Sequence, residues 1–319
     1  MLDPREIYDV DPVAAEVLDD AARRGTGPVL LHAVRGFVDA GHAGQVAVDH
    51  LVATGAPERV VTFDVDQLLD YRSRRPVMTF DSGWTGYDAP ELVVDLLRDA
   101  EGRPYLLLHG AEPDVQWERW VAAVRQLVER FDVPLVVGVH GIPMGVPHTR
   151  PISVTAHATR DQLVEEHPSF FGTVQVPGSA SALLEMRLGE VGRDAMGFAV
   201  HVPHYLAQSA FPPAGLAALR LVERATGLDL RVADLEPAAQ EALAEVQRQV
   251  EGSAEVAAVV DALEEQYDSF TRSVGRPSLL AQVADLPTAE EIGAELEQFL
   301  AAHTQDEEGR GTDGEGGPR

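Results

Sequence analysis

Residues 28–51, PVLLHAVRGFVDAGHAGQVAVDHL, constrain the fold more than any other stretch of the chain. An apolar run over 29–34 is followed by three glycines, Gly36, Gly41 and Gly44, and then by apolar residues at helical spacing. This pattern predicts a buried strand, a tight turn and a helix, which together make half of a β-α-β unit. Open α/β sheets bind ligands beyond the carboxyl ends of their strands, so this turn is the first place to expect a site.

Asp39 stands where that helix is expected to begin, and it has two interpretations. Its carboxylate can cap the helix while the glycines allow close packing of helix on sheet, and this arrangement needs no ligand. Alternatively, Asp39 or the amides after it belong to a small-molecule site at the start of the helix. The segment matches neither the dinucleotide-binding fingerprint nor the phosphate-binding P-loop.

Apolar runs alternate with helical patterns as far as residue 226. Strands are predicted at 59–65, 77–80, 91–98, 104–109, 134–140, 152–156 and 195–202, and helices at 11–24, 42–54, 117–131, 160–167, 178–188 and 213–226. The runs at 104–109 and 134–140 are almost wholly apolar, as in central strands covered on both faces. The strand at 59–65 is expected to run parallel to the first strand. The alternation predicts an α/β fold with a mostly parallel sheet.

The composition excludes several classes of function. The 319 residues include no cysteine, which excludes disulfides, thiolate metal sites and cysteine nucleophiles. All 25 basic residues are arginine, which excludes lysine Schiff bases and the P-loop lysine. The formal net charge of -27 repels nucleic acid and anionic membranes, so we expect neither as a partner. No apolar stretch has the length of a membrane span and the acidic N-terminus is unlike a secretory signal, so we expect a cytoplasmic protein.

The chain changes character near residue 234. Residues 232–319 contain 20 acidic and 5 basic residues, and their pattern predicts helices alone, at 236–251, 254–270 and 289–302. Residues 303–319 contain almost nothing apolar and are expected to be disordered. We therefore predict an α/β core over 1–233, an acidic helical appendage over 234–302 and a disordered tail over 303–319.

Five histidines lie at or just beyond the predicted strand ends: His109, His140, His148, His201 and His204. A parallel sheet would gather them on one edge, which is an arrangement that invites a zinc site. However, no carboxylate stands beside them at a diagnostic spacing, and histidines at strand ends commonly donate to loop carbonyls while neutral. We therefore assign no metal and no cofactor.

Two further polar segments have a structural and a functional interpretation each. DYRSRRP places Arg72, Arg74 and Arg75 at the expected carboxyl end of the strand at 59–65, where they either pair with nearby aspartates or bind an anion. The proline-rich loop over 141–151 either covers the sheet or presents its polar residues for function.

The sequence contains no recognised catalytic motif. It has no GxSxG elbow, and Ser179 and Ser181 are more simply helix caps. Asp114 is interpreted as the cap of the helix at 117–131.

Several segments in this order resemble the proteasome assembly chaperone type 2 family in its actinobacterial form, which has a C-terminal helical extension. They are GFVDAGHAGQVAVDHL, DYRSRRP, GAEPDVQW, GIPMGVPHTRP and HVPHYL with the helix after it. The resemblance covers about residues 28–227. It implies a three-layer α/β/α sandwich similar to the purine nucleoside phosphorylase architecture, and homo-oligomeric assembly. In archaeal and eukaryotic relatives it implies a chaperone role in building the 20S proteasome.

The resemblance also marks family-typical positions, which become candidates for binding a ligand or partner. They are Asp39, Gly41, Asp70, Tyr71, Arg72, Arg75, Pro76, Glu112, Pro113, Asp114, His148, Thr149, Arg150, His201, His204 and Tyr205. Some chaperones of this group dock on the proteasome through a terminal hydrophobic-tyrosine-any tripeptide. The sequence ends in Gly317, Pro318 and Arg319, so that docking mode is not expected.

Two hypotheses follow. The first is a non-enzymatic, oligomeric scaffold of the proteasome-assembly-chaperone type, with proteasome subunits as partners. The second is a phosphorylase-like or hydrolase-like enzyme, in which Arg75 or Arg150 holds an anion, Asp39 orients it, and His148 or His204 carries the proton. A variant of the second is nucleotide binding without turnover. The enzyme hypothesis requires these groups to surround one shared cavity.

Overall fold

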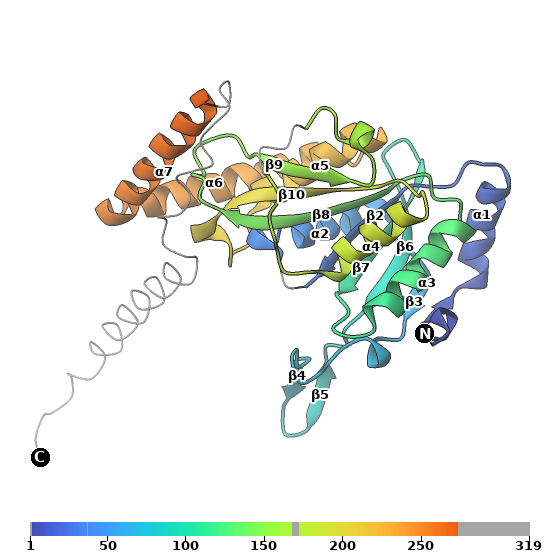
Figure 1. The fold of residues 1–319 in the computed structure, drawn as a ribbon. Helices are drawn as coiled ribbons and strands as arrows, with labels where there is room; N and C mark the ends of the chain where they lie inside the picture. Colours follow the sequence, from blue (N-terminus) through green and yellow to red (C-terminus); the bar gives the residue numbers. More distant parts are fainter. Residues whose placement is uncertain (1, 37, 168–171, 274–319) are drawn as a thin grey trace, which may run out of the picture. The chain divides into compact units, whose positions relative to one another are not determined.

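The computed structural model describes residues 2–36, 38–167 and 172–273 (Figure 1). The contacts divide the chain into two compact units, Met1–Glu264 and Glu265–Arg319, and the first unit holds the sheet and every candidate residue. Within the described ranges, no helix combines the length and the apolar character that crossing a membrane requires.

The first unit is built on an eight-stranded sheet of order β1-β3-β6-β7-β2-β8-β10-β9. The strands are β1 (Tyr8–Val10), β2 (Leu30–Arg35), β3 (Glu58–Phe63), β6 (Leu92–Arg98), β7 (Pro104–Ala111), β8 (Val136–Met144), β9 (Val154–Ala158) and β10 (Ala195–Pro203). A separate hairpin consists of β4 (Met78–Phe80) and β5 (Trp84–Tyr87). The predicted strands are therefore all present.

Five of the eight strands run in the same direction. β7, β2, β8 and β10 pair in parallel, and β3 shares their direction because two antiparallel pairings, through β6, separate it from β7. The expected direction of β3 is correct, although β6 and β7 lie between it and β2. The carboxyl ends of these five strands consequently lie along one edge of the sheet, and so do the starts of the loops that follow them.

Helices cover both faces of the sheet, which confirms the three-layer fold. On one face, α1 (Pro12–Arg23), α3 (Trp117–Arg130) and α4 (Ala180–Glu190) bury their apolar sides in a core that includes Trp120 and Leu184. On the other face, α2 (Ala43–Gly55) and α5 (Pro212–Thr226) pack over Leu31 and Leu107. Each fully buried side chain of this size contributes about 1.5–3 kcal/mol, so the two cores hold the sheet edge rigid.

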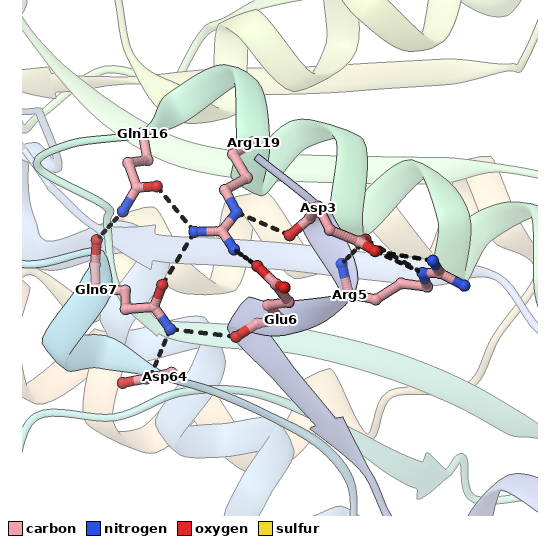
Figure 2. A network of polar contacts seen from close by, with 7 residues as sticks. All are labelled: Asp3, Arg5, Glu6, Asp64, Gln67, Gln116 and Arg119. Atoms are coloured by element: carbon pink, nitrogen blue, oxygen red, sulfur yellow. Dashed lines mark hydrogen bonds and ion pairs between the residues drawn. The ribbon is translucent and has the colours of Figure 1, made fainter. Parts of the chain in front are cut away.

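A buried arginine fastens the N-terminal segment to the sheet domain (Figure 2). Arg119 of α3 is 4% exposed, and its guanidinium donates to the Asp3 carbonyl and to the side chains of Glu6, Gln67 and Gln116 at 2.9–3.0 Å. A buried guanidinium needs this many acceptors, because leaving its charge unpaired would be costly.

The two acidic helices α6 (Glu236–Glu251) and α7 (Ala254–Ser273) follow the α/β part. Their positions confirm the predicted helices at 236–251 and 254–270. An ion pair between Arg220 and Glu236, 2.6 Å long, joins α5 to α6. The predicted helix at 289–302 and the predicted tail at 303–319 lie outside the described residues, and the boundary at 234 stays a prediction.

Two sequence predictions were wrong in their details. The segment 160–167 is not a helix but contains a single 3-10 turn, Asp161–Leu163, because only the adjacent Leu163 and Val164 pack against the core and no helical stripe follows them. Strands β7, β8 and β10 are longer than predicted. His109, His140 and His201 therefore lie inside strands, since β8 and β10 stay paired through Met144 and Pro203.

Candidate functional site

Asp39 joins the turn after β2 to two other elements. Its Oδ1 accepts hydrogen bonds from the amides of Gly44 at 2.8 Å and Gly141 at 2.9 Å, and its Oδ2 accepts from the Gln45 amide at 3.1 Å. The first turn of α2 is thus capped, as the structural interpretation expected, and β8 is tied to the same carboxylate. All three donors are backbone amides of the protein.

Gly41 allows this turn to pack closely on the loop after β10. Its φ is 63°, and its amide donates to the Ala207 carbonyl at 2.8 Å while its carbonyl accepts from the Phe211 amide at 2.8 Å. A β-carbon at Gly41 would lie 3.0 Å from both Phe211 and Val202. Both the left-handed conformation and the close approach therefore favour glycine here.

The loop after β8 is fixed by the loop after β10. The Tyr205 hydroxyl accepts from the His148 amide at 2.9 Å and lies 2.7 Å from His148 Nδ1, and the two rings meet edge to face. Burial raises the pKa of Tyr205 to about 12 and lowers the pKa of His148. Burial also lowers the pKa of His204, whose ring lies against Tyr205. The two histidines are accordingly neutral at pH 7.

The acidic helices α6 and α7 supply further partners to this loop. His148 Nε2 lies 3.4 Å from Gln247 Oε1, the Thr149 hydroxyl donates to Glu264, and Arg150 forms an ion pair with Glu264 at 3.1 Å. Gln247 and Glu264 could not be found from the sequence, because neither belongs to a motif and each contacts the loop only in the folded chain.

His201 is separated from this group although it was predicted beside it. The side chain is buried within β10, with Nδ1 2.8 Å from the Ser153 hydroxyl and Nε2 2.8 Å from the Thr155 hydroxyl. Burial lowers its pKa, so it is a neutral ring held between two hydroxyls.

A second polar group occupies the ends of β2, β3 and β7. Arg74 donates to the Arg35 carbonyl at 2.9 Å, to the Glu112 carbonyl and to the Asp114 carboxylate at 2.5 Å. Asp114 also accepts from the Asp70 amide at 2.8 Å. The prediction that Asp114 caps α3 is therefore wrong. The cap position belongs to Gln116, and the Asp114 side chain binds the arginine segment instead.

Other family-typical residues of this second group also have structural partners. The Tyr71 hydroxyl donates to Asp66 at 2.5 Å, and the Arg72 amide donates to the Asp70 side chain at 2.9 Å. Glu112 is buried, and its Oε1 accepts from the Ala180 amide at 2.7 Å, which fixes the start of α4. The network interpretation of this segment is the one that these contacts support.

His148 and His204 both contact Tyr205, but Asp39, Arg150 and the arginine segment, which the enzyme hypothesis places around the same cavity, have separate partners. Asp39 binds three backbone amides and Arg150 binds Glu264, while the arginine segment binds the ends of β2 and β7. Two small cavities, one lined by Leu31 and Leu107 and one by Leu30 and Leu106, lie in the apolar cores. In the described part of the chain, no three acidic or histidine side chains are placed to hold a metal ion.

Sequence reasoning missed two polar sets, of which the first is buried and the second is half-buried. Asp95 in β6 binds Arg59 at 2.5 Å and His109 at 2.9 Å. Burial raises the pKa of its carboxyl, but the hydrogen bonds from His109 and Arg59 together lower that pKa below the usual range. His157 of β9 binds Glu185 of α4 at 2.8 Å. A polar residue in an otherwise apolar strand was the available signal, but its partner depends on strand order.

Several solved structures are similar to this chain over most of its length. A Mycobacterium tuberculosis protein of unknown function is 47% identical, with a TM-score of 0.80 over 84% of this chain and 91% of that one. A Corynebacterium glutamicum protein of unknown function is 37% identical, with a TM-score of 0.78 over 85% and 99%. A Mycobacterium tuberculosis proteasome-assembly chaperone homologue is 26% identical, with a TM-score of 0.67 over 73% and 99%.

A search among curated proteins finds no match. The profile of the PAC2 family matches residues 33–250, a range that contains both polar groups of the sheet edge and most of α6. The resemblance stated from the five sequence segments is therefore confirmed, and this chain belongs to the PAC2 family.

Proposed function

We propose that this protein is a non-enzymatic, chaperone-like interaction scaffold that self-associates and binds proteasome subunits. The observation that carries the proposal is how the family-typical residues use their hydrogen bonds. Asp39, His148, Arg150 and Tyr205 fix loops to one another at the sheet edge, and each has a hydrogen-bond or ion-pair partner within the chain. Such an edge presents a rigid surface, which suits recognition of another protein.

The comparisons support the same proposal. The chain belongs to the PAC2 family, and one solved relative at 26% identity is described as a proteasome-assembly chaperone homologue. The enzyme hypothesis has no comparable support, because Asp39 and Arg150 already have partners within the chain.

A pull-down tests the partner. The full chain with an N-terminal affinity tag is mixed with purified actinobacterial proteasome α and β subunits at mild salt, and the bound fraction is analysed by native mass spectrometry. An unrelated protein of similar negative charge serves as the control, because a net charge of -27 alone retains basic proteins. Specific retention of either subunit supports the proposal, and recovery equal to the control contradicts it.

A thermal-shift panel on the same preparation tests the alternative. Nucleosides, nucleotides and inorganic phosphate are added at millimolar concentration, since a ligand that binds only the folded state raises the midpoint. A saturable shift together with an empty pull-down would favour an anion or nucleotide site over the scaffold.

A further inference from the structure

The loop after β8 carries two donors that bind a carboxylate supplied by the chain itself. The Thr149 hydroxyl donates to Oε1 of Glu264 in α7, and the Arg150 guanidinium donates to Oε2 of the same side chain at 3.1 Å. Arg150 also donates to the Thr149 hydroxyl at 3.4 Å, so the two residues act as one unit. Donors on both oxygens fix the position and the orientation of a carboxylate. Glu264 therefore shows which chemical group this pair of residues recognises.

The donor pair is held in place by the sheet domain rather than by α7. The Tyr205 hydroxyl accepts from the His148 amide at 2.9 Å, so the residue before Thr149 is fixed to the loop after β10. Pro147 and Pro151 flank the segment and restrict its backbone. We therefore expect the two donors to keep their positions when α7 is displaced.

The helix α7 rests on this loop through a narrow stripe of side chains. Within residues 254–264 only Val260 is buried, with 4% of its surface exposed, while Leu263 and Glu264 are half-buried. Most of the other side chains in this range are exposed, and Val259 is one of them at 48%. A helix that buries so little apolar surface has a low local stability, so it can open without unfolding the sheet.

The position of α7 in the chain also allows it to move by itself. Gly252 and Ser253 separate α7 from α6, and such short connections between helices can act as hinges. The PAC2 profile ends at residue 250, so Thr149 and Arg150 lie inside the family domain and Glu264 lies outside it. The donors thus belong to the family domain, whereas the carboxylate that fills them comes from an addition to it.

The surface beneath α7 defines the kind of segment that fits there. Among residues 141–151, Arg150 alone carries a formal charge. A β-carbon added to Gly145 would lie 3.9 Å from Leu263, so α7 places an apolar side chain over the loop directly beside the carboxylate of Glu264. A segment that replaces α7 must offer the same two groups side by side, as one face of an amphipathic helix does.

We propose that α7 is a displaceable cover on this loop, and that a proteasome subunit docks in its place with an amphipathic helix whose carboxylate binds Thr149 and Arg150. The cover and the partner compete for the same donors. The apparent affinity is therefore reduced by the fraction of chains in which the cover is closed. This inference rests on the proposed function and assigns the surface through which the proteasome partner is bound.

Amide hydrogen exchange on the full chain tests the cover without any partner. V260D places a charge at the one buried position of the stripe, so exchange in residues 254–264 should be faster than in the wild type. The central strand β7 should stay protected, which verifies that the sheet domain is folded. V259D, at the exposed neighbouring position, is the matched control and should exchange as the wild type does.

A charge reversal tests the contact that closes the cover. R150E places two carboxylates together, so it should accelerate exchange in residues 254–264. The double variant R150E/E264R rebuilds the ion pair with its charges exchanged and should restore protection. E265Q, at an exposed position next to Glu264, should leave exchange unchanged.

Biolayer interferometry with purified actinobacterial proteasome α and β subunits tests the docking surface. V260D should bind the subunit that the wild type retains more tightly by about tenfold or more, because the cover no longer competes. V259D should bind as the wild type does. Adding R150Q to V260D should abolish the gain, because the docking carboxylate then loses its charged donor.

The outcomes separate this inference from the function on which it rests. If exchange in residues 254–264 is no faster in V260D and R150E than in the wild type, α7 is not a cover closed by these contacts, and the inference is overturned. If α7 opens but V260D binds the subunits no more tightly than the wild type, the docking surface is overturned while the proposed function stands. If no chain, including the wild type, retains either subunit above the charge-matched control, the proposed partner is overturned and the docking surface with it.

Discussion

The carboxylate of Asp39 and the backbone amide of Gly141, 102 positions apart in the sequence, are joined by a hydrogen bond of 2.9 Å. The same oxygen accepts from Gly44 at the start of α2. One side chain therefore holds the end of β2, the start of α2 and the middle of β8 in a single arrangement. The bond explains why the turn after the first buried strand requires an acid even without a ligand.

Asp39→Ala should destabilise the fold by about 2 kcal/mol, since it removes a helix cap and leaves the Gly141 amide without its acceptor. Asp39→Asn should cost less, because its carbonyl oxygen can still accept one of the amide bonds. Urea unfolding at pH 7 measures both values. Asp49→Ala, at an exposed position of α2, should change stability by less than about 0.5 kcal/mol. Equal losses in the Asp39 and Asp49 variants would contradict the bridging role.

The sequence predicted the elements well and the contacts between them poorly. Buried strands such as 104–109 could be predicted, because an apolar run of that length flanked by turn residues is typical of a buried strand. The capping role of Asp39 was also visible, because it depends on residues five and six positions later. Its bond to Gly141 was not, because it depends on β2 and β8 being neighbours in the sheet.

The arginine segment illustrates the same limit. DYRSRRP indicated a charged network, but the resemblance pointed to Arg72 and Arg75, whereas Arg74 makes the contacts. Which of three nearby arginines turns inward is decided by the carbonyls at the ends of β2 and β7, and those become neighbours only after the sheet has formed. Local sequence cannot distinguish the three.

Gly141→Ala should be among the most damaging single changes to the sheet edge. A β-carbon there would lie 2.0 Å from the Ala40 carbonyl oxygen, and backbone cannot move aside as a side chain tip can. We expect a loss of about 3 kcal/mol or more, or failure to fold. Gly145→Ala, at the residue after β8, is the matched control, because the nearest atom to its added carbon is 3.9 Å away. Thermal unfolding compares the two, and similar midpoints would show that the turn can relax.

Arg119→Ala should release the N-terminal segment from the sheet domain. It leaves the Asp3 carbonyl, Glu6 and two glutamine side chains without their shared donor, at a predicted cost of about 3 kcal/mol for a buried cation. Hydrogen exchange should accelerate first in residues 3–10. Arg23→Ala removes an exposed arginine paired within its own helix and should have almost no effect. If amide exchange in residues 3–10 is no faster in the Arg119 variant than in the wild type, Arg119 does not anchor the N-terminal segment.

Two histidines near the centre of the sheet should make stability fall in mild acid. Burial lowers the pKa of His32 to about 4, and burial followed by the charge of His157 lowers the pKa of His140 to about 4. Between the unfolded value near 6.5 and this value, the unfolded chain binds protons that the folded chain does not. The unfolding free energy therefore decreases as pH falls from about 6.5 to about 4, by up to about 1.4 kcal/mol per pH unit for each histidine.

His32→Gln separates this effect from acid titration of carboxylates. The buried Asp95 and Asp99 have pKa values below their usual range, so their contribution is lost at lower pH, below the histidine window. Urea unfolding at half-unit steps from pH 7.5 to 4 should show a shallower slope for His32→Gln than for the wild type. His42→Gln, at an exposed position, is measured in parallel as the control for the substitution itself. Parallel curves for His32→Gln and the wild type would mean that His32 is protonated in both states or in neither, and that the acid sensitivity arises elsewhere in the sheet.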